Sequence, residues 1–93
     1  MILEKDVEAR LTLGVEKLGG KCVKFIPDLM PGMPDRLILL PGGTAIWAEL
    51  KRPVGGRLSE LQKYRHKFLR DLGFRVEVVW TKEAADEFLQ SLT

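Results

Sequence analysis

The sequence contains one cysteine, Cys22, and one histidine, His66. A single cysteine cannot form a disulfide within the chain, and a lone thiol is typical of a reducing compartment. Because His66 has no second histidine beside it, nothing indicates a zinc site. We therefore expect an intracellular protein that folds without disulfides or zinc, in which Cys22 packs as a small hydrophobic residue.

Long apolar runs are absent too. The longest stretch without a charged side chain, 37–48, is much shorter than the roughly 20 residues of a membrane-spanning helix, and Pro41-Gly42-Gly43 interrupts it. At the N-terminus, the charged residues 4–6 follow Met1 too closely for a secretory signal peptide. These features predict a cytoplasmic protein with no membrane partner.

What the sequence does have is the composition of a folded domain, with 45% hydrophobic and 30% charged residues. Its 93 residues suit one hydrophobic core, so we expect a single domain over 1–93. A domain of this size buries only a modest part of its surface. This favours self-association or a bound ion as a further source of stability.

Hydrophobic periodicity predicts a helix at the N-terminus, ended by Gly19-Gly20, whose apolar face comprises Leu3, Val7, Leu11, Val15 and Leu18. Gly14 lies inside this helix, and we expect a neighbouring backbone to approach closely there. Short β-prone segments predict strands over 21–26, 36–40, 44–51 and 74–80. Between the second and third of these, Pro41-Gly42-Gly43 predicts a tight antiparallel hairpin.

A second helix is predicted after the segment 53–56, ending at Gly73, with a core face of Leu61, Tyr64, Phe68 and Leu72. Thr81 can cap a third helix, which buries Phe88, Leu89 and Leu92. The connection between the third and fourth strands is long enough for a right-handed parallel crossover. We therefore predict an α/β fold of the order αβββαβα, a mixed four-stranded sheet flanked by helices, with a C-terminal helix.

Three residues of the predicted hairpin have side chains suited to chemistry. Glu49 and Lys51 project from the same side of their strand, while Leu50 points into a core. The hairpin brings Asp35, at the start of the second strand, beside them. Two carboxylates without histidine or thiolate form a hard oxygen site that suits Mg²⁺ or Mn²⁺ better than zinc.

A divalent ion held there could activate a water for phosphodiester hydrolysis, with Lys51 orienting the water or stabilising the developing charge. The alternative is a solvated face on which charged residues are merely exposed. A carboxylate in a central strand is costly to bury without a partner, which favours a role for Glu49. The chemistry of the residues alone leaves both interpretations open.

The residues also resemble a known family. Pro34-Asp35, thirteen intervening residues and Glu49-Leu50-Lys51, on an αβββαβ succession, resemble the PD-(D/E)XK nuclease superfamily. More narrowly, the chain from its first helix to about Trp80 is similar to the VRR-NUC (virus-type replication-repair nuclease) domain. The segments that carry this resemblance are Gly32-Met33-Pro34-Asp35-Arg36, Pro41-Gly42-Gly43, Glu49-Leu50-Lys51-Arg52-Pro53, Leu58-Ser59 and Leu61-Gln62. It implies a restriction-endonuclease-like αβββαβ core.

The resemblance also implies a set of site residues. Asp35, Glu49 and the Leu50 carbonyl would bind the metal ion, and Lys51 would act on the water or the charge. A glutamate of the first helix would join them, either Glu8, which matches the family pattern better, or Glu4. An exposed helix carboxylate is the alternative for both.

On the second helix, Gln62 matches the family's active-site glutamine. Ser59-Glu60-Leu61-Gln62 is also a capping box, in which the Gln62 side chain would fold back to the Ser59 amide. Both interpretations of Gln62 remain open from the sequence.

The segment from Lys51 to Arg70 is strongly basic, with Glu60 as its one acidic residue. Candidates for contacts with DNA phosphates are Arg52, Arg57, Lys63, Lys67 and Arg70, of which the last three form a stripe along the second helix. Such a stripe is otherwise a solvated face. His66 is expected on the surface, within reach of DNA.

Together, the chemistry and the resemblance predict a Mg²⁺- or Mn²⁺-dependent DNA endonuclease. Isolated domains resembling VRR-NUC are associated with branched DNA, including four-way (Holliday) junctions, with DNA repair and with homodimers. A two-fold dimer would present two sites to a two-fold junction. Phage or bacterial origin would suit such a minimal nuclease. The alternative is a non-catalytic DNA-binding module that keeps the nuclease fold.

Overall fold

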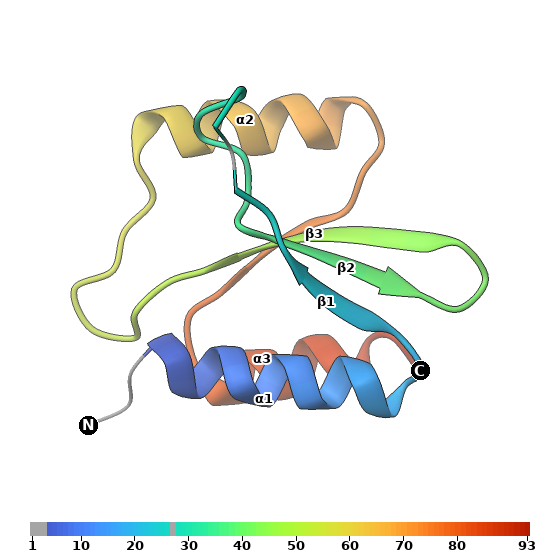
Figure 1. The fold of residues 1–93 in the computed structure, drawn as a ribbon. Coiled ribbons are helices and arrows are strands. Elements are labelled where there is room, and N and C mark those ends of the chain that lie inside the picture. The colour runs from blue at the N-terminus through green and yellow to red at the C-terminus, as the bar shows by residue number, and fades with distance from the viewer. Residues whose placement is uncertain (1–3, 27) are drawn as a thin grey trace.

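The computed structural model describes residues 4–26 and 28–93, so the prediction for Leu3 lies outside the described residues. The elements are α1 (Glu4–Lys17), β1 (Lys21–Lys24), β2 (Arg36–Leu40), β3 (Thr44–Leu50), α2 (Glu60–Asp71), β4 (Val76–Val79) and α3 (Lys82–Gln90) (Figure 1). This confirms the predicted order αβββαβα. β1, β3 and β4 are shorter than predicted, although the Phe25 amide still donates to the Asp35 carbonyl over 2.8 Å.

The four strands form one mixed sheet in the order β1-β2-β3-β4. β2 pairs antiparallel with both β1 and β3, while β3 and β4 are parallel, as the crossover through α2 requires. Gly42 and Gly43 have φ angles of 87° and 83° in the β2–β3 turn, a conformation that side chains other than glycine rarely adopt. The hairpin therefore depends on Gly42 and Gly43, the same residues whose presence in the sequence predicts a tight turn.

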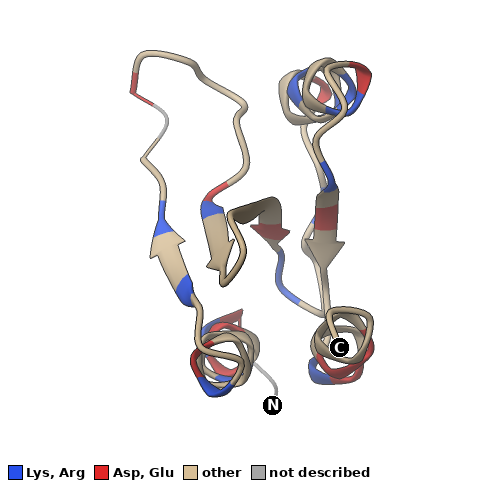
Figure 2. Ribbon diagram, turned by 90° about the vertical axis from the view of Figure 1, so that its right-hand side faces the viewer, with Lys and Arg blue, Asp and Glu red and all other residues tan. Residues whose placement is uncertain are grey.

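The main core lies between the sheet and the two terminal helices. α1 and α3 lie side by side on one face of the sheet (Figures 1 and 2). Val7, Leu11 and Val15 are fully buried there, which confirms the predicted face of α1. At Gly14 the close neighbour is a side chain of α3 and not a backbone: a Cβ added there would lie 2.3 Å from Leu89 Cδ1. Gly14 thus allows the two helices to pack.

A smaller core lies on the opposite face, under α2. It contains Met33, Leu69 and Val76, with Phe25 and Trp47 packed against it in an edge-to-face contact whose ring centroids are 5.1 Å apart. In the end-on view, α2 lies over the β4 side of the sheet, and the loop after β1 lies over the β1 and β2 side (Figure 2). Strand alternation places Val23 and Leu39 on this sheet face, and both side chains are exposed.

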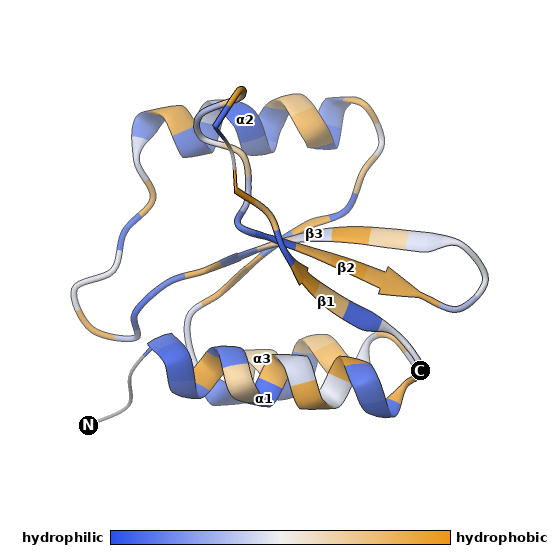
Figure 3. Ribbon diagram, viewed as in Figure 1, coloured by the Kyte–Doolittle hydropathy of each residue, from blue (hydrophilic) through white to orange (hydrophobic). Residues whose placement is uncertain are grey.

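The predicted core face of α2 is wrong. Leu61, Tyr64, Phe68 and Leu72 are between 39% and 62% exposed, and we call them the apolar α2 flank. The buried residues of the helix are His66 and Leu69. Figure 3 shows hydrophobic and hydrophilic residues alternating along α2. The helix packs over the side of the sheet near β4. Its polar residue His66 therefore faces the sheet, and the apolar α2 flank lies outside the core.

Among the described helices, none combines the length and the apolar character that crossing a membrane would need.

Candidate active site

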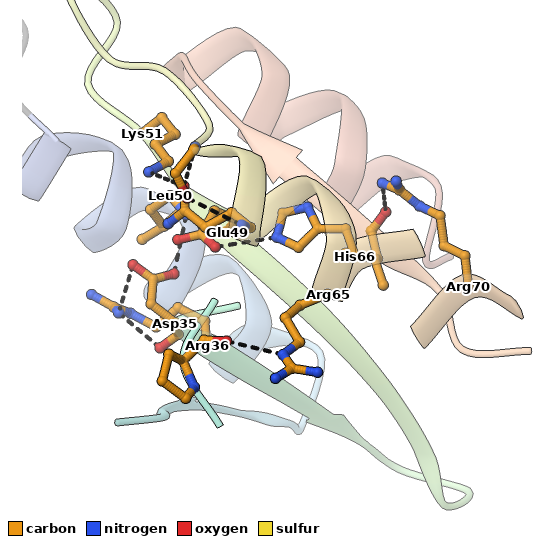
Figure 4. Close-up of polar contacts among 12 residues, drawn as sticks. Asp35, Arg36, Glu49, Leu50, Lys51, Arg65, His66 and Arg70 are labelled. Atoms are coloured by element: carbon orange, nitrogen blue, oxygen red, sulfur yellow. Dashed lines mark hydrogen bonds and ion pairs between the residues drawn. The ribbon is translucent and has the colours of Figure 1, made fainter. Parts of the chain in front are cut away.

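The hairpin gathers Asp35, Glu49 and Lys51 as the sequence predicts. Asp35 immediately precedes β2, and Glu49 and Leu50 end β3. The Leu50 amide donates to Asp35 Oδ1 over 3.1 Å, which fixes the Asp35 carboxylate against the end of β3 (Figure 4). Since a strand residue directs its amide and its carbonyl toward the same neighbouring strand, the Leu50 carbonyl also lies on the Asp35 side.

Glu49 is a buried carboxylate beside a second carboxylate. Burial is the main cause that raises the pKa of Glu49 to about 7, and the charge of Asp35 is the second. The charges of Lys51 and Arg36 oppose this shift. Burial also raises the pKa of Asp35, against the Leu50 amide and the Arg36 charge. Two neighbouring carboxyl groups that both resist ionisation are typical of a site that a cation would stabilise.

The donor set fits a hard divalent cation. Two carboxylates and a backbone carbonyl are oxygen ligands of the kind that Mg²⁺ and Mn²⁺ prefer. Within 4–26 and 28–93, no three His, Cys, Asp or Glu side chains come close enough together to form a metal-binding group. The residues brought together are therefore a pair of carboxylates, and any further protein ligand has to come from the backbone or from a side chain that moves.

Glu8, the preferred helix ligand, points to Arg36. The Arg36 guanidinium forms an ion pair with Glu8 and also donates to the Asp35 carbonyl over 3.0 Å. The same guanidinium lies 3.3 Å from Asp35 Oδ2, and it is buried whereas Glu8 is 44% exposed. Arg36 thus links the α1 carboxylate to the site. Glu4 acts on Glu49 only through its charge, so the choice between Glu8 and Glu4 stays open.

Arg36 is a site residue that the sequence reasoning missed. It belongs to the same Pro-Asp-Arg segment that carried the resemblance, but a strand position next to a candidate ligand gave no reason to expect a buried guanidinium. Its burial between two acidic groups is what makes it tolerable there.

Gln62 Oε1 contacts both the start of α2 and the Lys51 side chain. The Ser59 backbone amide donates to Gln62 Oε1 over 2.9 Å. In return, Ser59 Oγ accepts from the Gln62 backbone amide, which completes the capping box. Lys51 Nζ donates to the same Oε1 over 2.9 Å. The cap that starts α2 therefore also holds the candidate catalytic lysine.

His66 is not on the surface, so that prediction is wrong. Its side chain is 1% exposed, and Nε2 lies 3.2 Å from Glu49 Oε1. Burial, followed by the charges of Arg70 and Lys51, lowers the pKa of His66 and favours the neutral ring. The sequence held a signal for this: His66 follows Gln62 by one helical turn and therefore shares its face.

The basic candidates lie mainly on exposed surfaces. Lys67 and Lys63 form ion pairs with Asp71 and Glu60 on the same helix, at 2.7 Å and 3.3 Å. Arg70 donates to the Val76 carbonyl over 2.8 Å, so part of its guanidinium is used within the fold. Arg52 and Arg57 are exposed in the loop between β3 and α2.

A mixed αβββαβ sheet with paired carboxylates and a lysine at the ends of β2 and β3 defines the restriction-endonuclease-like class of the PD-(D/E)XK nucleases. The sequence matches no family model. It is similar to "Putative nuclease p44" of Acyrthosiphon pisum secondary endosymbiont phage 1, with 38% identity over 79 residues, 85% of this chain and 84% of the relative. A solved structure described as a VRR_NUC domain superposes with a TM-score of 0.88 and 27% identity, covering 97% of both chains. The chain belongs to the VRR-NUC nuclease family.

Proposed function

We propose that this chain is a Mg²⁺- or Mn²⁺-dependent endonuclease that hydrolyses phosphodiester bonds in DNA, with its activity contained in one domain over 1–93. The observation that carries the proposal is the pairing of Asp35 with the buried Glu49, beside the ammonium of Lys51. An acidic pair of this kind is stabilised by a divalent cation and otherwise weakens the fold. Family membership and the name of the phage relative favour the same activity.

Asp35, Glu49 and the Leu50 carbonyl would hold the ion, and Glu8 would join them on leaving Arg36. When bound, such an ion lowers the pKa of a water and neutralises charge on the phosphate. Lys51 contributes a preorganised positive charge, because Gln62 Oε1 fixes its ammonium. A fixed ammonium at this place stabilises negative charge that develops on the reacting phosphate.

The DNA backbone would follow the exposed basic residues around the site. Arg52 and Arg57 lie on the loop that leaves β3, and Lys63 and Lys67 lie on α2. Arg70 would contact DNA with the part of its guanidinium that does not bind Val76. Contacts of this type position the duplex and carry no sequence information.

We further propose that the substrate is branched DNA, such as a four-way junction, and that a homodimer cuts it. The apolar α2 flank and the exposed Val23 and Leu39 support the dimer, since a small domain rarely leaves so much apolar surface without a partner. A two-fold dimer carries one site in each subunit, matched to the two-fold symmetry of a junction.

The experiment that tests the activity incubates the pure protein with a labelled four-way junction and a linear duplex, in Mg²⁺, Mn²⁺ or EDTA. We expect cleavage of the junction with either metal, none in EDTA, and none by Glu49→Gln. Binding without product under every condition would favour the alternative, a DNA-binding module that keeps the nuclease fold.

A further inference from the structure

The hydrogen bond between Glu49 and His66 lies where water cannot compete with it. The Glu49 and His66 side chains are 4% and 1% exposed, and Glu49 Oε1 lies 3.2 Å from His66 Nε2. In Figure 4 the other Glu49 oxygen lies on the side of Asp35. The two oxygens of this carboxylate therefore have different surroundings.

The geometry also fixes which ring nitrogen carries the proton. Among the atoms of 4–26 and 28–93, His66 Nδ1 is buried and has no hydrogen-bond partner. A proton on Nδ1 would leave a buried donor unsatisfied and turn the Nε2 lone pair toward a carboxylate oxygen. A proton on Nε2 instead donates to Glu49, so this tautomer has the lower energy.

We infer that His66 is a positioning residue for the proposed metal ligand Glu49. Its Nε2–H holds Oε1 and leaves Oε2 for the cation between Glu49 and Asp35. Partners of this kind orient metal ligands and commonly change metal affinity roughly 10- to 100-fold. This inference rests on the proposed function, because it concerns the orientation of a ligand for a divalent ion.

The arrangement of α2 strengthens this assignment. His66 and Gln62 are one turn apart on the helix. His66 binds Glu49 near the end of β3, and Gln62 binds Lys51 just after it. Leu69, the next inward residue, belongs to the small core. Along α2, the residues that face the sheet therefore first contact the site residues and then pack into the small core. This explains why a histidine occupies a position where a leucine would otherwise be expected.

The test uses three variants at position 66 and Mn²⁺ as the probe. His66→Leu fills the space without a donor. His66→Gln places an amide N–H close to the position of Nε2, while His66→Asn places one close to that of Nδ1, away from Glu49. Mn²⁺ affinity is measured by titration calorimetry in the absence of DNA, and the Mn²⁺ concentration for half-maximal cleavage is measured separately.

We expect His66→Leu to weaken Mn²⁺ binding and raise the Mn²⁺ requirement roughly 10- to 100-fold, with kcat at saturating Mn²⁺ reduced much less. His66→Gln should recover most of the affinity and His66→Asn little of it. Leu69→Val is the matched control, because it loosens the same face of α2 and should lower the melting temperature without changing Mn²⁺ affinity.

Wild-type Mn²⁺ affinity in His66→Leu would overturn the positioning role. If His66→Leu fails to fold, the comparison of His66→Gln with His66→Asn decides, and equal affinities overturn the inference. Failure of the wild-type protein to bind Mn²⁺ or to cut any DNA would instead refute the proposed function itself.

Discussion

The Lys51 ammonium donates to Gln62 Oε1 over 2.9 Å and so joins the end of β3 to the first turn of α2. The same oxygen accepts a hydrogen bond from the Ser59 backbone amide in the capping box. One carbonyl oxygen thus serves both the helix start and the candidate catalytic lysine, because an amide oxygen has two lone pairs. Folding of α2 and placement of Lys51 are therefore coupled.

Gln62→Ala should lower both stability and activity. Loss of the Gln62 half of the capping box costs up to about 1 kcal/mol of unfolding free energy, and a protein whose Lys51 lacks this acceptor should cleave more slowly, by roughly tenfold. Ser59→Ala is the matched control, since it removes the hydroxyl that accepts the Gln62 amide but keeps the Lys51 contact. It should lose similar stability and retain activity. Urea unfolding and junction cleavage measure the two effects, and equal activity losses would contradict the coupling.

The stability of the metal-free protein should fall as pH rises toward 7. The pKa of Glu49 is raised from 4.5 to about 7, so between these values the folded chain keeps a proton that the unfolded chain has lost. The unfolded state then binds fewer protons, and the free energy of unfolding decreases with rising pH. The decrease due to Glu49 is at most about 3 kcal/mol and levels off above its folded pKa.

The measurement is urea unfolding in EDTA at a series of pH values, compared with Glu49→Gln. His66 contributes with the opposite sign, since its lowered pKa makes the folded chain the weaker proton binder. The difference between the two proteins therefore reports on Glu49 together with its coupling to Asp35 and His66. A difference that does not change with pH would contradict the raised pKa. Saturating Mg²⁺ should reduce the loss of stability above pH 7, because the ion favours the ionised carboxylate.

Local patterns predicted the parts of the fold that local interactions determine. The buried face of α1 follows from its helical spacing, and the β2–β3 turn follows from Gly42 and Gly43. The convergence of Asp35 with Glu49 also follows, because an antiparallel hairpin fixes which residues lie opposite one another. These elements depend on residues that are close in sequence or joined by one tight turn.

The orientation of α2 could not be predicted in the same way. Tyr64 and Phe68, on its apolar flank, are exposed, whereas its inward line carries Gln62 and His66. His66 can be buried, and Gln62 partly buried, because Glu49 and Lys51 provide hydrogen-bond partners for them. Such pairs are separated by 11 and 17 positions in sequence, beyond the reach of helical periodicity.

Glu8→Gln should destabilise the fold more than Glu4→Gln, one turn earlier. Glu8 neutralises Arg36, which is 6% exposed as a side chain, whereas Glu8 itself is largely solvated. The loss should therefore be about 1 kcal/mol, below the cost of breaking a fully buried pair. Urea unfolding measures it, and equal values for the two variants would contradict the role of the Glu8–Arg36 pair. Calorimetry with Mn²⁺ on the same variants identifies the helix ligand.

The double variant Phe68→Asp, Leu72→Asp should be monomeric. Both residues belong to the apolar α2 flank, and new carboxylates there cannot be buried in an interface without a large desolvation cost. Sedimentation equilibrium should give a dimer for the wild type and a monomer for the variant. Leu13→Asp is the control, since Leu13 is an exposed leucine on α1, on the other side of the sheet, and the dimer should persist. A monomeric wild type would refute the proposed assembly.

Lys67→Ala should weaken junction binding and reduce the slope of log affinity against log salt by about one, because one phosphate contact releases about one counterion.

Asp71 competes for the Lys67 ammonium at 2.7 Å. Asp71→Asn should therefore have the opposite effect and strengthen binding at low salt. Lys17→Ala removes another exposed charge near the end of α1, across the sheet, and should leave the slope unchanged. Binding is measured by fluorescence anisotropy in Ca²⁺ or with Glu49→Gln to prevent cleavage. If the slope of log affinity against log salt is the same for Lys67→Ala and the wild type, the DNA path lies away from α2.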